Sequence, residues 1–307
     1  MASLATERQL PSVDVIRPFQ LDHAGLRGRF VRLGPAAATI LSRHAYPDPV
    51  SRLLGEVLVL GTTLAAALKF DGVFTLQMRG DGPVSLVVAD YVSAAGKPGA
   101  IRGYAQFDKG KLERALAGGA AASVPRLLGN GQLVFTVDQG VQDRYQGIVA
   151  LDGATIAECA NAYFRDSEQI DTAIRLAAAP GGDGGWHAGA LMVQRLPEAH
   201  PGEAALDDWR RVALLAASVS ERELLDAGLN PDALLWRVFH EEGIRVYPAF
   251  GIEVGCRCTR ERVENVLRSF PADEIAGMAV DGRISVNCQF CNRAFDFDPG
   301  EVALAAP

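Results

Sequence analysis

The chain has 307 residues, of which 49% are hydrophobic and 22% charged, as is typical of a folded globular protein with room for two domains. The net charge of −7, with no cluster of Lys and Arg, argues against a nucleic-acid-binding protein, which usually presents a basic face.

The first twenty residues carry charges throughout and no apolar run, so we expect a flexible leader and no secretory signal. The most apolar stretch, residues 53–68, is too short to span a bilayer comfortably and contains Glu56. It predicts a buried core helix and no membrane partner. We therefore expect a cytoplasmic protein, whose cysteines serve as metal ligands, catalytic thiols or packing groups rather than as static disulfides.

Residues 30–196 mix strand and helix patterns. Alternating residues at 74–78 and 84–92 flank the turn sequence Gly80-Asp81-Gly82-Pro83, which predicts a hairpin. Further strands are predicted at residues 100–107, 132–137, 146–151, 172–176 and 191–196. Short glycine-rich connections favour antiparallel pairing.

A helix is predicted at residues 155–165, with Ile156, Cys159 and Tyr163 on one apolar stripe. Cys159 is therefore expected to be a buried, inert thiol. Residues 180–185 are rich in glycine and predict a surface loop. Together these patterns indicate an α+β domain.

The pattern becomes helical after about Pro197. Residues 207–219 predict an amphipathic helix, and Ser220 with Glu223 forms a capping box for the next. Asn230 caps a third helix, which ends at Gly243. These helices enclose little core by themselves and must pack against a neighbour.

The last segment predicts a small mixed fold. Thr259 caps a helix that carries Val263, Val266 and Leu267, and Pro271 is expected to end it. Ile284 and Val286 alternate into Cys288, and Phe295 and Phe297 alternate out of Cys291. The fold is therefore predicted to be α+β in three parts: residues 15–198 form an α+β domain with antiparallel sheets, 199–250 a helical linker, and 251–300 a small α+β zinc domain.

Four of the five cysteines lie in this last part, as Cys256-Arg257-Cys258 and Cys288-Gln289-Phe290-Cys291. Four thiolates suit tetrahedral zinc, so Cys256, Cys258, Cys288 and Cys291 are predicted to bind one Zn²⁺. Zinc with four thiolates carries a formal charge of −2, which nearby arginines could offset. The candidates are Arg257, Arg260 and Arg293.

Two roles for this centre remain open from the residues alone. Most four-cysteine sites only stabilise a fold. However, Cys256 and Cys258 are alternate residues, whose sulfurs could join with strain, and both pairs are local, so oxidation could form two disulfides and expel the metal.

Other motifs give weaker signals. His240-Glu241-Glu242 lacks the second histidine of a zinc protease helix, and we interpret it as a helix end. The glycines at 129 and 131 complete neither a dinucleotide fingerprint nor a P-loop. Without a recognisable catalytic constellation, the chain is not expected to be an enzyme.

The cysteine pattern resembles the zinc-centre signature of the 33-kDa heat-shock protein family, the redox-regulated holdase chaperones. Residues 68–77, 80–83 and 145–149 are similar to that family's first domain, and residues 163–169, Tyr-Phe-Arg-Asp-Ser-Glu-Gln, resemble its Y-F-x-x-S-E-Q segment. The leader and the loop at 180–185 depart from the family's pattern. Whether Ser167-Glu168-Gln169 binds clients or supports the fold is open, and no client-binding residues are assigned.

The resemblance implies a cytoplasmic chaperone that holds unfolding proteins without ATP. Reduced and zinc-bound, it would be inactive. Oxidation would join Cys256 to Cys258 and Cys288 to Cys291, release zinc, unfold the linker and favour a homodimer. The alternative is a constitutive zinc-stabilised interaction module, perhaps one that contacts nucleic acid, and the acidic charge balance argues against it.

Overall fold

The computed structural model describes residues 13–140, 144–195 and 202–303. The chain divides into two compact units, Met1–Val254 and Gly255–Pro307, each of which is described here by itself. None of the helices in the described ranges has the length and apolar character that a bilayer crossing requires.

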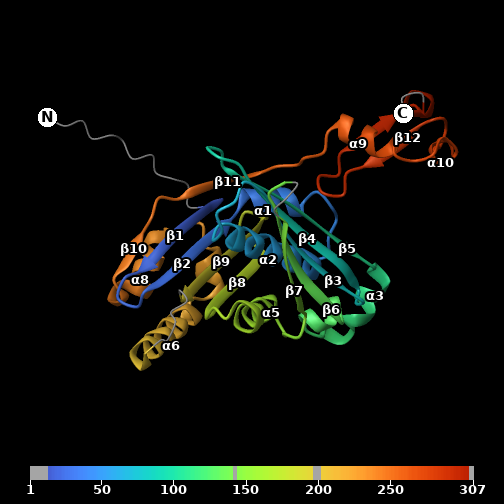
Figure 1. Cartoon of the computed structure of the whole chain (residues 1–307). Coiled ribbons are helices and arrows are strands. Elements are labelled where there is room, and N and C mark those ends of the chain that lie inside the picture. Colours follow the sequence, from blue (N-terminus) through green and yellow to red (C-terminus); the bar gives the residue numbers. More distant parts are fainter. Residues whose placement is uncertain (1–12, 141–143, 196–201, 304–307) are drawn as a thin grey trace. The chain divides into compact units, whose positions relative to one another are not determined.

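An eleven-stranded sheet forms the larger unit, in the order β7-β6-β3-β4-β5-β11-β1-β2-β9-β8, with β10 paired to β1 (Figure 1). Its strands are β1 (Val15–Leu21), β2 (Leu26–Leu33), β3 (Gly72–Gly80), β4 (Val84–Ser93), β5 (Gly99–Phe107), β6 (Gly131–Asp138), β7 (Arg144–Ala150), β8 (Thr172–Pro180), β9 (Trp186–Arg195), β10 (Ile244–Val246) and β11 (Phe250–Val254). Neighbours pair antiparallel, except that β11 runs parallel to β5. The hairpin of β3 and β4 and the later strands are confirmed, although position 196 lies outside the described residues.

The main core lies between this sheet and its helices. Those helices are α1 (Pro35–Leu41), α2 (Asp48–Ala65), α3 (Lys109–Ala115), α4 (Val124–Leu128) and α5 (Ile156–Tyr163). Helix α2 is almost wholly buried, which confirms the predicted core helix. It packs closely on β8, because a Cβ atom added at Gly55 would lie 2.7 Å from the Cβ atom of Ala178.

A second core forms against β1, β2, β8 and β9. Helices α6 (Glu203–Ser218), α7 (Glu221–Leu225) and α8 (Pro231–Phe239) contribute buried residues such as Val212, Leu224 and Phe239, which meet Phe19 and Phe30 of the sheet. The ring centroids of Phe19 and Phe239 are 5.6 Å apart. These helices therefore pack against a neighbour, as expected of helices too short to enclose a core alone.

Two expectations are corrected in the larger unit. Part of the predicted flexible leader lies in the buried strand β1 (Val15–Leu21), because Ile16 packs in the main core and Phe19 in the second core. The segment after α8 is also not purely helical, since β10 and β11 both pair with β1. Strand β10 has three residues and β11 has five. In segments this short, a weak alternation of apolar and polar residues does not predict a strand.

The smaller unit is built around a two-stranded sheet. Its elements are α9 (Arg260–Leu267), α10 (Ala272–Gly277), β12 (Ile284–Asn287), β13 (Ala294–Phe297) and α11 (Pro299–Ala303). Its buried apolar residues are Leu267, Ile275, Ile284, Phe295, Phe297 and Val302.

Two details of the smaller unit differ from expectation. Val266, one of three apolar residues that the sequence places on α9, is 60% exposed and lies outside the core. Pro271 does not end α9, whose last residue is Leu267, but caps the start of α10. An amphipathic pattern on so short a helix fixes the buried stripe only to within one residue.

Candidate metal centre

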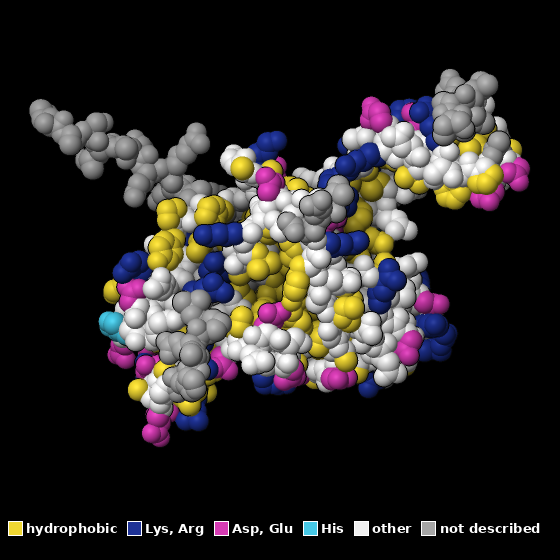
Figure 2. All heavy atoms as spheres, viewed as in Figure 1, with side chains coloured by type: hydrophobic (Ala, Val, Ile, Leu, Met, Phe, Trp, Pro, Cys, Tyr) yellow, Lys and Arg dark blue, Asp and Glu magenta, His cyan; other side chains and the backbone are white. Residues whose placement is uncertain are grey.

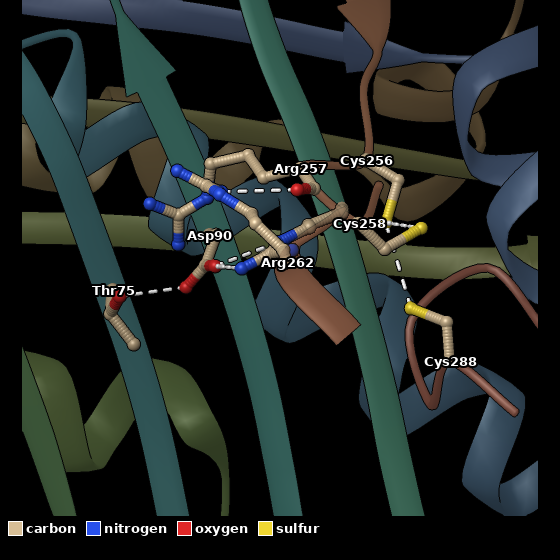
Figure 3. A network of polar contacts seen from close by, with 8 residues as sticks. Thr75, Asp90, Cys256, Arg257, Cys258, Arg262 and Cys288 are labelled. Carbon is tan, nitrogen blue, oxygen red and sulfur yellow. Dashed lines mark hydrogen bonds and ion pairs between the residues drawn. The ribbon is translucent and has the colours of Figure 1, made fainter. Parts of the chain in front are cut away.

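The first cysteine pair lies on extended chain just before α9. Only Gly255 separates Cys256 from the end of β11 at Val254. Thr259 begins α9 as predicted, because its hydroxyl accepts a hydrogen bond from the backbone N–H of Arg262 at 3.2 Å. In Figure 3 the side chains of Cys256 and Cys258 emerge from this short stretch of chain.

The second pair lies in the turn between β12 and β13, as the alternating residues predicted. The backbone N–H of Cys288 donates to the carbonyl of Arg293 at 2.9 Å, and that of Asn292 donates to the carbonyl of Cys288 at 2.7 Å. Asn292 has a φ of 56°, a left-handed conformation that asparagine tolerates better than most residues. The tight turn therefore presents both cysteines on one side.

The four sulfur atoms meet at one point, all within 4.8 Å of one another. The Sγ atom of Cys258 lies 3.3 Å from those of both Cys256 and Cys291, and the Cys256 and Cys288 sulfurs are 3.7 Å apart. Figure 3 shows the sulfurs of Cys256, Cys258 and Cys288 turned toward one another. Two segments far apart in the sequence thus converge on a single cluster.

This cluster fits a tetrahedral zinc ion. Zn–S bonds of about 2.3 Å place neighbouring sulfurs about 3.8 Å apart, close to the observed separations. The four side chains are half-buried, and Cys258 and Cys288 pack against the core of the smaller unit. The donor set, four thiols without a histidine or an open carboxylate, is typical of a closed zinc site.

Ionisation within the cluster is uneven. Burial alone would raise the pKa of the Cys256 thiol, but hydrogen bonds from the Cys258 backbone N–H and the neighbouring thiols lower that pKa to about 6. Burial and contacts with the other thiols raise the pKa values of Cys258 and Cys288. Hydrogen bonds from its neighbours therefore favour a thiolate at Cys256, whereas burial and the other thiols favour the protonated form at Cys258 and Cys288.

The arginines near the cluster contribute in different ways. The guanidinium of Arg260 stacks over the ring of Phe297 at 4.5 Å and so covers the small core. Arg262, which the sequence analysis did not single out, donates to the carbonyl of Arg257 at 3.0 Å (Figure 3). This bond fixes the backbone between the first two cysteines.

Cys159 lies apart from the cluster, in the core of the larger unit. It is 1% exposed and its Sγ atom is 3.9 Å from the carbonyl of Gly153. Burial raises the pKa of this thiol. The prediction that Cys159 is buried is confirmed, and its inertness stays a prediction.

The weaker motif at His240 is a helix end, as expected. Residues His240–Glu242 form one 3-10 turn after α8, and Gly243 stops it with a φ of 66°. Within the described parts of the chain, the four cysteines are the one group of three or more His, Cys, Asp or Glu side chains close enough to share a metal ion.

Two polar features escaped the sequence analysis. Arg32 is 0% exposed and donates to three backbone carbonyls, those of Glu223 and Leu224 on α7 and of Leu229 before α8. Helices α6 to α8 are called the linker helices below. The sequence pattern could have indicated this role, because Arg32 shares a strand face with Leu26 and Phe30, where a charged residue is unexpected. The second feature is a contact of Tyr145 and Tyr163 with Glu168, to which only the shared Y-F-x-x-S-E-Q segment pointed.

Comparisons with known proteins agree on one family. The model of the family described as Hsp33 protein matches residues 14–298. A 33 kDa chaperonin of Caulobacter vibrioides is 40% identical over 291 residues, covering 93% of this chain and 95% of that protein. Another, from Ectopseudomonas mendocina, is 37% identical over 294 residues, covering 94% of each. The crystal structure of the 33 kDa chaperonin from Thermotoga maritima superimposes with a TM-score of 0.79 at 25% identity, covering 94% of this chain and 96% of that one.

Proposed function

Because this chain belongs to the Hsp33 protein family of chaperones, we propose that it holds unfolding proteins without ATP, and that oxidation of its cysteine cluster switches it on. The observation that carries this proposal is the convergence of two local cysteine pairs on one point, with all sulfurs within 4.8 Å of one another. A reduced cluster of this kind can hold a metal ion, and an oxidised one cannot.

In the reduced state the four cysteines would bind one Zn²⁺. The bound ion would keep all four sulfurs as thiolates and join the segment before α9 to the β12–β13 turn. Among the described residues of the smaller unit, six apolar side chains form the buried core. Its fold would therefore depend on the cysteine cluster far more than the larger unit does.

Oxidation would convert thiolates into disulfides. Each pair of thiolates would give two electrons to an oxidant such as peroxide and form one S–S bond, which removes two metal ligands. Distance alone does not select the partners, because Cys258 lies 3.3 Å from both Cys256 and Cys291. We favour Cys256 with Cys258 and Cys288 with Cys291, since residues two or three apart stay adjacent when the small core loosens.

The signal would reach the linker helices through the continuous chain. Strand β11 ends at Val254, immediately before the first cysteine pair, and it is held in the sheet by pairing with β1 and β5. Loosening at Cys256 would weaken that short strand first. Strand β10 and helix α8 precede it directly, so α6 to α8 would lose support in turn.

Loosening of these helices would expose a surface for clients. The second core contains Phe19 and Phe30 on the sheet and Trp209, Val212 and Phe239 on the helices. Trp236 and Leu214, on the outer faces of the same helices, are already 61% and 73% exposed. Separation of the two faces would therefore create one large apolar surface, the kind that binds unfolded chains or a second subunit.

We extend the proposal to partners and location. Unfolding proteins are the clients, the oxidised form is a homodimer through the exposed linker surface, and the protein acts in the cytoplasm without enzymatic turnover. The net charge of −7 argues against nucleic acid as a partner.

The proposal is tested by aggregation of a heat-unfolding reporter enzyme, monitored by light scattering. We expect peroxide-treated protein to suppress aggregation and the reduced, zinc-loaded protein to have little effect. Metal analysis should give one zinc per reduced chain. The variant Cys288→Ser/Cys291→Ser should lose at least half of that zinc, since two of the four ligands are absent.

Cys159→Ser is the matched control, because it removes a thiol buried elsewhere in the chain. It should bind zinc fully and respond to peroxide like the unmodified protein. Equal suppression by reduced and oxidised protein would refute the redox switch. Full zinc occupancy in Cys288→Ser/Cys291→Ser would refute the assignment of the ligands.

A further inference from the structure

A cavity of about 420 Å³ opens in the larger unit beside α5. Its walls are mostly apolar and include several aromatic side chains, among them Phe70, Phe74, Phe135 and Phe164. Figure 2 shows hydrophobic side chains gathered above α5, between β7 and β8, with Lys and Arg side chains at the margins. The volume lies within the range of small-molecule sites, roughly 300–1,000 Å³.

The chain forms an unusual turn to build one wall of this cavity. Residues Phe164–Glu168 form a π-helical turn, which ends at Gln169 with a φ of 54°. Residues five apart meet in a π-helix, so Glu168 lies against Tyr163. Both the π turn and a left-handed glutamine are unfavourable locally, and such conformations concentrate at binding sites.

The π turn places a polar cluster at the cavity wall. The hydroxyls of Tyr145 and Tyr163 both donate to Glu168 Oε1, the former at 2.7 Å, and the two hydroxyl oxygens are 3.1 Å apart. Burial and the bond to Glu168 raise the pKa of Tyr163, so its hydroxyl stays protonated and keeps donating. The carboxylate of Glu168 is thus satisfied by the protein's own phenols.

The two cations that line the cavity, Arg27 and Lys69, form no ion pair with a carboxylate among the described residues. Arg27 lines the cavity, and its buried Nε atom has no hydrogen-bond acceptor among the described residues. The charge of Arg27 also lowers the pKa of neighbouring Arg29, after the larger effect of burial. A negative group bound here would relieve both the unsatisfied donor and the repulsion.

We propose that this cavity binds a small carboxylic acid with an apolar body. The carboxylate would accept from Arg27, with Lys69 nearby, and the body would lie between the aromatic walls. A cavity of about 150 Å³ already accommodates a benzene ring, so the observed volume leaves room for two fused rings and the acid group. Its aromatic walls belong to the main core, so binding does not require the linker helices to open and goes beyond the chaperone function.

The test uses the full-length, reduced, zinc-loaded protein and isothermal titration with naphthalene-2-carboxylate. We expect one site per chain, with a dissociation constant of roughly 10–500 µM for a ligand of this size. The neutral isostere naphthalene-2-carboxamide should bind at least tenfold more weakly. Hydrogen exchange should slow at residues 163–170 when the acid is bound.

Three variants locate the site. Arg27→Gln should weaken binding of the acid at least tenfold and leave the amide unchanged, and Arg27→Lys should restore most of the affinity. Arg114→Gln, which removes the same charge from an exposed position on α3 outside the cavity, should have no effect. The restored affinity of Arg27→Lys distinguishes loss of the charge from loss of the fold.

Equal affinity for acid and amide, or equal losses in Arg27→Gln and Arg114→Gln, would overturn the proposal. So would displacement of the acid by N-acetyl-phenylalanine amide at comparable concentration, which would assign the cavity to aromatic side chains of clients. All these readouts are binding measurements on the reduced protein, so they are independent of whether oxidation activates the chaperone.

Discussion

At the scale of single residues, Arg32 connects the sheet to the linker helices. Its guanidinium donates hydrogen bonds to three backbone carbonyl oxygens. These belong to Leu224 at 2.8 Å, Leu229 at 2.7 Å and Glu223 at 2.9 Å. Its guanidinium also lies 4.9 Å from the ring centroid of Phe30. Burial lowers the pKa of Arg32 to about 10, so the side chain is still charged at neutral pH. One side chain on β2 therefore satisfies two carbonyls of α7 and one in the loop before α8.

Replacing Arg32 by methionine should weaken the attachment of the linker. The three carbonyls would lose a charged donor, which costs roughly 2–4 kcal/mol in the free energy of linker opening. We expect faster hydrogen exchange in α7 and α8 and measurable chaperone activity under reducing conditions. Arg126→Met, which removes an exposed arginine–carbonyl bond to Ala115, serves as the control and should change neither. Unchanged exchange in Arg32→Met would show that apolar packing alone holds the helices.

A second residue gives the larger unit a pH dependence. Burial raises the pKa of Glu56, on α2, from 4.5 to about 7, although the charge of Arg52 lowers it. The folded state therefore binds this proton more tightly than the unfolded state. The resulting stabilisation is fully present below about pH 4.5 and is lost as the pH rises through about 7.

Glu56→Gln should remove this dependence, because glutamine does not ionise. At pH 8 the variant should be more stable by about 2–3 kcal/mol, and at pH 4.5 the difference should nearly vanish. Denaturant unfolding of the reduced protein at several pH values measures both. Glu113→Gln, at an exposed position on α3, should leave the profile unchanged. If the free energies of unfolding of Glu56→Gln and of the unmodified protein changed with pH in parallel, Glu56 would not be the source of the pH dependence.

At the scale of elements, the linker helices differ in how firmly they are held. Helix α6 spans sixteen residues but buries only Val212 and Ala216, while the nine residues of α8 bury four. A bidentate ion pair joins Arg211 of α6 to Glu242, which follows α8 and is only 3% exposed. The helices therefore support one another, and loss of one weakens the rest.

Hydrogen exchange on reduced and oxidised protein tests this coupling. On oxidation we expect protection to fall in residues 203–254 and in the smaller unit, with α6 the first of the three helices to exchange. Strands β3, β4 and β6 should stay protected, because their residues fill the main core. If the oxidised protein suppresses aggregation while α6 to α8 remain as protected as before, unfolding of the linker is not the switch.

At the scale of the whole molecule, stability is distributed unequally between the two units. The larger unit combines eleven strands with two apolar cores, whereas the smaller unit has two strands and one small core. Structural zinc contributes on the order of 10 kcal/mol in small domains, and the conformational entropy of folding offsets most of what so few buried side chains contribute. The smaller unit should therefore fold only with its metal.

Removing zinc with a strong chelator under reducing conditions should unfold residues 255–303 and leave the sheet intact. Nuclear magnetic resonance of the backbone amides would show collapsed dispersion for the smaller unit alone. Added zinc should restore the spectrum, which excludes irreversible damage. A smaller unit that keeps its native spectrum without metal would show that its apolar core suffices, and zinc release could not then transmit a signal.

The sequence alone determined the cysteine cluster and most regular elements, because these depend on local patterns. Two cysteine pairs beside alternating strands, the capping box at Ser220 and the buried stripe with Cys159 all fit within windows of a few residues. The three-part division and the pairing of the disulfides stay predictions.

Only the tertiary structure decided what distant segments do together. Strand β1 looked like a leader because Arg17 and Pro18 interrupt its apolar pattern, and β11 gained strand structure only from neighbours at β1 and β5. The buried role of Arg32 depends on carbonyls almost two hundred residues away. The cavity beside α5 likewise forms from strands and turns that no local pattern relates. Burial and pairing across the sheet are properties of the folded whole, so no short window of sequence contains them.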